Sequence, residues 1–113
     1  MIVVLTSLRL RSLWGFFRLS WHGLQISRQA KKQQGFLSLK NTGLGHNHFT
    51  MSAWKTEEDM KAFAKSGAHL TAMKESATIS TTIKTLMYST DKLPSWKEAK
   101  QLLNEKGKAL HYH

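Results

Sequence analysis

The chain has 113 residues, 41% of them hydrophobic, and a net charge of +10. This composition is too apolar for a disordered chain and fits one domain over residues 1–113. The absence of cysteine excludes disulfides and thiolate metal sites. No run of about 18 uncharged apolar residues occurs, so we predict no transmembrane helix and no membrane insertion. No basic segment precedes the apolar start, which disfavours a signal peptide, and we expect a cytoplasmic protein.

The positive charge is concentrated in the first half of the chain. Residues 1–56 hold eight basic residues and no acid, whereas residues 57–113 hold nine basic and seven acidic residues. Such asymmetry can mark a surface for nucleic acid, anionic lipid or an anionic small molecule. The basic residues are scattered in runs of no more than two, which favours a solvated basic face.

The first two elements are predicted to be a strand and a helix. Residues 2–10 are rich in β-branched and aliphatic side chains, which predicts a buried strand. Ser12 can cap the following helix, and Gly35 is placed to end it. Spacings of three and four residues predict that one stripe of this helix packs on the sheet. The stripe consists of Trp14, Phe17, Trp21, Leu24 and Arg28.

A hairpin and a second helix are predicted next. Residues 36–41 and 46–54 read as antiparallel strands, and the glycines in residues 41–45 favour a turn between them. The sequence from Thr56 to Asp59 resembles a capping box, which predicts that a helix begins there. Gly67 is an internal weak point of that helix and predicts a kink or a close approach.

Residues 81–90 predict a fourth strand, and Ser95 with Glu98 forms a capping box for a last helix that ends at Gly107. The tail after Lys108 can form a further short strand. The order β-α-β-β-α-β with an added C-terminal helix predicts an α+β, ferredoxin-like fold with one antiparallel sheet. With two helices on one face, the other face is left open and apolar, so we expect a homodimer with sheets face to face.

The segment from Ser52 to Phe63, SAWKTEEDMKAF, runs into Ser66-Gly-Ala-His69. In this stretch the chain resembles the dimeric α+β-barrel superfamily, in particular antibiotic-biosynthesis-type monooxygenases and spheroidene-monooxygenase-like proteins. Members include cofactor-free oxygenases, haem-binding and haem-degrading proteins, and dehydratases. The resemblance implies a ligand between the sheet and the helices, and an aromatic or polyene-type substrate.

Within that resemblance, His69 and His22 are the candidate catalytic bases, because histidine is the side chain that titrates near neutrality. Five further residues are expected to line the ligand pocket: Trp54, Trp21, Phe63, Phe17 and Met73. A non-enzymatic protein that binds a small molecule, or haem, in the same cavity is the alternative. The resemblance favours a site without a cofactor and leaves haem as the possible alternative. Haem-degrading members carry their axial histidine nearer the end of this helix than His69, which argues against haem ligation by His69.

Other functions find less support in the residues. His46 and His48 have the spacing of two ligands on one strand face, but no carboxylate precedes Glu57, so we expect no metal site. An RNA-binding module shares the predicted topology and the positive charge. The strand over residues 46–54 lacks the basic and aromatic motif of such modules, which disfavours nucleic acid as a partner.

Overall fold

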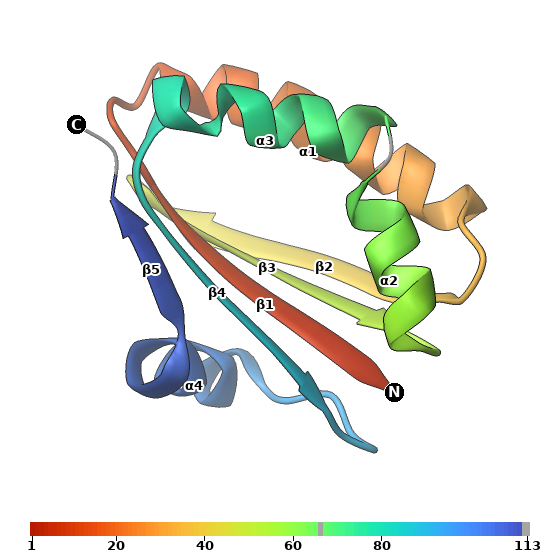
Figure 1. Ribbon diagram of the computed structural model, residues 1–113. Helices are drawn as coiled ribbons and strands as arrows, with labels where there is room; N and C mark the ends of the chain where they lie inside the picture. The colour runs from red at the N-terminus through yellow and green to blue at the C-terminus, as the bar shows by residue number, and fades with distance from the viewer. Residues whose placement is uncertain (66, 112–113) are drawn as a thin grey trace.

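The computed structural model describes residues 1–65 and 67–111, leaving aside the side chains of residues 44, 68–70, 72, 77 and 111. One sheet has the strand order β2-β3-β1-β4-β5, and all its neighbouring strands are antiparallel. This confirms the predicted α+β, ferredoxin-like fold (Figure 1). The elements in chain order are β1 (Ile2–Leu10), α1 (Gly15–Lys32), β2 (Phe36–Leu44), β3 (Asn47–Trp54), α2 (Glu57–Ala64), α3 (Gly67–Ile79), β4 (Ser80–Ser89), α4 (Trp96–Lys106) and β5 (Lys108–His111).

Two of the predicted helix caps form as expected. The hydroxyl oxygen of Thr56 accepts the backbone N–H of Asp59 at 3.1 Å and begins α2. The hydroxyl oxygen of Ser95 accepts the backbone N–H of Glu98 at 3.2 Å and begins α4. The prediction for Ser12 was wrong, because α1 begins at Gly15 without a side-chain cap and Ser12 lies in the preceding turn.

Three glycines lie at breaks between elements, and the hairpin turn is the one whose place differs from the prediction. Residues 41–44 continue β2, and the hairpin turns at Gly45, whose φ of +60° suits glycine. The predicted second helix divides into α2 and α3, and Gly67 opens α3 with a φ of +24°. Gly35 has a φ of +81° and follows the end of α1, as predicted for a helix-stopping glycine.

The two faces of the sheet are covered differently. α1 and α3 lie side by side over one face, whereas α4 packs on the opposite face (Figure 1). Val3 and Leu5 of β1 are fully buried there against Ala99 and Leu103 of α4. The expectation of an entirely open face was therefore wrong, because the added C-terminal helix covers part of it. Within the described residues, no helix combines the length and apolar character needed to cross a membrane.

The stripe predicted to pack on the sheet is in fact the outer face of α1. Trp14, Phe17, Trp21 and Leu24 are all exposed. The opposite side of the helix carries His22 and Ala30, which are buried. Helical spacing identifies a stripe on one side of a helix, but it does not say whether that side faces the core.

Candidate functional site

A hydrogen-bonded cluster joins the two helices above the sheet. The Nε2–H of His22, on α1, donates to Oε2 of Glu75, on α3, at 2.7 Å. Arg18, one turn before His22, places its guanidinium 3.2 Å from the same carboxylate oxygen. His22 is buried, with 11% of its side chain exposed, whereas the side chain of Glu75 is 40% exposed. One carboxylate thus holds both a buried imidazole and a guanidinium.

The antiparallel packing of α1 and α3 brings these residues together. Near one end of the pair, a Cβ atom placed on Gly15 would lie 3.5 Å from the carbonyl oxygen of Ile79. Near the other end, Gly67 faces the side chain of Gln29. His22 and Glu75 lie between these two approaches, at about the middle of both helices. The two contacts fix α1 and α3 at both ends, so that the imidazole of His22 meets the carboxylate of Glu75 between them.

The cluster has a defined charge arrangement. The hydrogen bond from His22 is the main cause that lowers the pKa of Glu75 below its usual value, and the charges of His22 and Arg18 lower it further. Glu75 therefore remains a carboxylate that accepts the Nε2 proton. Among the described residues, none hydrogen-bonds Nδ1 of His22. In the neutral ring with its proton on Nε2, Nδ1 carries the lone pair and can accept a proton.

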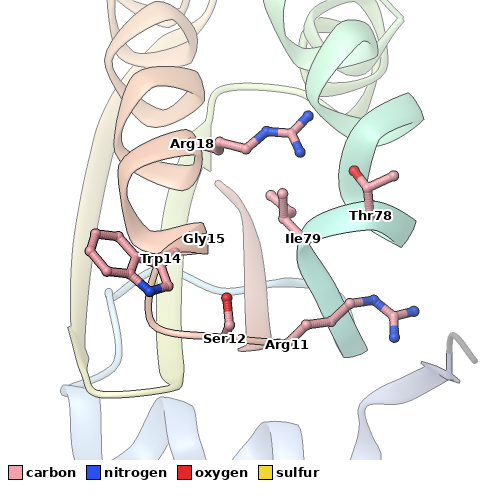
Figure 2. Close-up of a pocket in the computed structure, with 7 residues that line it drawn as sticks. All are labelled: Arg11, Ser12, Trp14, Gly15, Arg18, Thr78 and Ile79. Atoms are coloured by element: carbon pink, nitrogen blue, oxygen red, sulfur yellow. The ribbon is translucent and has the colours of Figure 1, made fainter.

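A cavity of about 230 Å³ adjoins this cluster at the start of α1 (Figure 2). Arg18 belongs to both, because it lines the cavity and pairs with Glu75. The guanidinium groups of Arg11 and Arg18 extend toward α3, where Thr78 and Ile79 form the facing wall (Figure 2). Two cationic groups near a hydroxyl suit a ligand that carries a carbonyl, phenolate or other electron-rich oxygen.

A second cavity of about 360 Å³ lies between the start of α1 and the β2–β3 hairpin. Phe16 and His48 both line it and contact each other with ring centroids 5.7 Å apart, and Phe17 also lines it. The Nε2–H of His48 donates to the carbonyl oxygen of Gly45 at 3.0 Å. This ring is therefore already engaged by the hairpin, and the cavity has mainly apolar walls.

The sheet beneath α1 and α3 is only partly covered. Val4, Thr6 and Leu8 of β1 face these helices and remain partly exposed, whereas Val3 and Leu5 on the other side are fully buried. Thr50 of β3 pairs with Thr6, and its hydroxyl donates to the side-chain oxygen of Asn41 at 3.0 Å. The face of the sheet beneath α1 and α3 is thus partly open to solvent, and it carries threonine hydroxyl groups.

Trp54 ends β3 in an aromatic cluster under the other end of α1. Its ring stacks on Phe63 at 4.8 Å between centroids and meets Phe36 edge-on at 5.8 Å. Trp54 is fully buried, yet its Nε1–H has no hydrogen-bond partner in the described part of the chain. An unpaired buried donor costs about 1–3 kcal/mol, and a ligand oxygen or a water molecule at this point would remove that cost.

The predicted site residues fall in different places. His22 is in the cluster, Trp54 and Phe63 form the aromatic contact, and Phe17 lines the second cavity. Trp21 and Met73 lie on the exposed surface of α1 and α3. His69 belongs to α3, and its side chain lies outside the described residues.

Sequence reasoning missed Glu75 and Arg18. Glu75 lies 53 positions from His22, and no local motif links them. A glutamate in the middle of a helix reads as a solvated charge, so only the packing of α1 against α3 reveals its role. Across the described residues, no group of three or more histidine, aspartate or glutamate side chains could hold a metal ion.

The fold is shared with several solved structures. A candidate antibiotic biosynthesis monooxygenase from Deinococcus radiodurans superposes with a TM-score of 0.73 and 13% identity, over 84% of this chain and 97% of that one. SnoaB from Streptomyces nogalater, a cofactor-independent oxygenase, superposes with a TM-score of 0.66 and 10% identity, over 83% and 97%. A candidate antibiotic biosynthesis monooxygenase from Nitrosomonas europaea gives 0.73 and 13%, over 83% and 93%.

No protein-family model and no curated protein matches the sequence. The structural likeness confirms that the chain has the fold implied by the resemblance in residues 52–69, that of the antibiotic biosynthesis monooxygenases and their dimeric α+β-barrel relatives. At this level of identity the likeness establishes the fold alone.

Proposed function

We propose that this protein is a small-molecule oxygenase of the monooxygenase-like type that oxidises an aromatic or polyene-type substrate without a cofactor. The observation that carries the proposal is the 2.7 Å hydrogen bond that orients a buried His22 on Glu75. This dyad occurs in a fold that the chain shares with a cofactor-independent oxygenase. Haem is the one cofactor that the resemblance to this superfamily allows, and the proposal does not require it.

In the proposed reaction, the substrate supplies the electrons. Nδ1 of His22 removes a proton from an acidic phenol or activated C–H group, and Glu75 stabilises the imidazolium that forms. The electron-rich anion then reduces O₂ and combines with it. For a substrate CH₂ group, one oxygen atom becomes the product carbonyl and the other leaves as water with both hydrogens of that group. For a quinol, which has no such group, O₂ takes up two electrons and two protons, so that the quinone and hydrogen peroxide form.

Arg18 and Trp54 have supporting roles in this proposal. Arg18 borders the cavity next to the dyad, where its positive charge favours the deprotonated form of the substrate. Trp54 lies under the other end of α1, and its buried, unpaired N–H would donate to a substrate that extends that far between the sheet and the helices. His69 is the second candidate base, since it lies on α3 with Glu75.

A binding protein without catalysis is the alternative function, and the exposed Glu75 favours it, because a dry site gives general bases their largest effect. Oxygen consumption separates the two. An oxygenase consumes O₂ in proportion to the quinol oxidised, whereas a binding protein holds the quinol with no uptake above the rate in buffer.

The assembly and location are part of the same proposal. We infer a cytoplasmic homodimer in which the α4 side of the sheet meets its counterpart. Phe49, Leu86 and Tyr88 are only partly buried beside α4, and burial of the Tyr88 phenol with the nearby charge of Glu98 already raises its pKa. A second copy would cover these apolar side chains.

A further inference from the structure

The outer face of α1 begins with an aromatic surface that no part of the described chain covers. Trp14 is 79% exposed, Phe17 66% and Trp21 61%. Leu13 and Leu24 extend the same surface and are also exposed. An exposed patch that contains two tryptophans and a phenylalanine on one helix face is unusual for a protein that is surrounded only by water.

The same face continues as a basic surface. Arg28, Lys31 and Lys32 follow Leu24 at helical spacing, and all three are exposed in the last turns of α1. The outer face of α1 thus consists of an aromatic half followed by a basic half. The opposite side of the helix is occupied by the core contacts of Ile26 and Ala30.

The charge around this face selects the kind of partner. Residues 1–56 contain no acidic residue, so the face carries no group that would neutralise the basic residues of a second copy. Glu75, the acid that pairs with α1, binds Arg18 and His22 on the side toward α3. α1 also lies on the opposite side of the sheet from α4, so a dimer formed through the α4 side leaves it exposed (Figure 1).

We propose that the outer face of α1 docks on an anionic lipid bilayer, with the helix lying parallel to the membrane surface. Tryptophan and phenylalanine side chains favour the boundary between headgroups and acyl chains, and arginine and lysine pair with anionic headgroups. Docking of this kind is peripheral and needs no segment that crosses the bilayer. The inference is independent of whether the His22–Glu75 dyad is catalytic.

The test measures binding of the full chain to lipid vesicles by flotation. We expect binding to vesicles with about 30% phosphatidylglycerol in phosphatidylcholine, and little binding to pure phosphatidylcholine, because anionic lipid supplies the attraction. The Trp14→Ser/Trp21→Ser variant should lose most of this binding. The Arg28→Gln/Lys31→Gln/Lys32→Gln variant should weaken it by about fivefold for each charge removed.

A matched variant separates docking from general electrostatic attraction. Lys97→Gln/Lys106→Gln/Lys108→Gln removes three exposed charges from α4 and β5, and it should bind vesicles nearly as well as the unchanged chain. Equal weakening by both triple variants would overturn the proposal, as would a lack of binding to anionic vesicles. Loss of dimer mass in Trp14→Ser/Trp21→Ser would assign the face to a second copy instead. Thermal melts confirm that each variant is folded.

Discussion

Nε2 of His22 and Oε2 of Glu75 lie 2.7 Å apart and join the middle of α1 to the middle of α3. The contact spans 53 positions of sequence. It gives one buried imidazole a fixed orientation, and it adds a contribution to stability that depends on the ionised carboxylate of Glu75.

The first prediction concerns pH. Since the pKa of Glu75 is lower in the folded state than its usual value of 4.5, the ionised carboxylate stabilises the fold above that pH. This stabilisation is lost as the pH falls below 4.5 and through the lowered pKa. The melting temperature of the unchanged chain should therefore exceed that of Glu75→Gln at neutral pH, and the difference should shrink in acid. Glu105→Gln, which removes one carboxylate from α4, is the control; a constant Glu75→Gln difference across the pH range would contradict the account.

Trp54 tests packing and ligand binding separately. Trp54→Ala should lower the free energy of unfolding by about 3–5 kcal/mol, because it empties the stack on Phe63. Trp54→Phe keeps an aromatic ring but removes the unpaired Nε1–H. It should change the melting temperature much less and still weaken quinol binding in a calorimetric titration. Unchanged affinity in a folded Trp54→Phe protein would make this residue purely structural.

Two glycines give opposite predictions for alanine. Gly23 lies inside α1, and a Cβ atom there meets nothing within 4 Å, so Gly23→Ala should stabilise the protein by about 0.5–1 kcal/mol. Gly35 has a φ of +81°, and a Cβ atom there would clash with the side chain of Asp59. Gly35→Ala should destabilise by more than about 1 kcal/mol. Urea unfolding of both variants measures the difference, and a stable Gly35→Ala protein would argue against this turn.

The molar mass of the protein in solution tests the proposed homodimer. Light scattering during size-exclusion chromatography should give twice the mass of one chain at micromolar concentration. Leu86→Ser, on the side of the sheet that α4 partly covers, should reduce that mass, whereas Met87→Ser, on the other side, should leave it unchanged. A monomer at all concentrations would contradict the dimer.

Much of the fold could be predicted because its signals are local. The β-branched residues of β1 and the capping residues Thr56 and Ser95 act within a few positions of the chain. The turn at Gly45 was misplaced because Gly43 and Gly45 both fit a turn by residue type, and only the pairing of Gly43 with His48 decides between them.

The site was harder to predict because its contacts are distant in sequence. His22 could be proposed from the chemistry of its side chain, but Glu75 becomes its partner only when α1 and α3 pack. The side of α1 that faces the sheet was predicted wrongly for a similar reason. Its aromatic stripe is the stronger apolar signal, yet the side with His22 and Ala30 faces the core. Which side of a helix is buried depends on the helix and sheet that pack against it. The sequence of the helix alone therefore does not determine the buried side.

The central claim, that His22 oriented by Glu75 is the base of a cofactor-free oxygenase, is tested most directly by oxygen consumption. An oxygen electrode measures uptake with naphthohydroquinone as the probe, above its rate in buffer, for the unchanged chain, His22→Gln and His46→Gln. His46 is the matched control, because its Nδ1–H donates to the backbone carbonyl of Leu10 instead of to a carboxylate. We predict uptake that falls by about a hundredfold or more in His22→Gln, the range expected for loss of a general base, and that persists in His46→Gln. Equal uptake by a folded His22→Gln protein, or none by the unchanged chain while it binds the quinol, would contradict the claim.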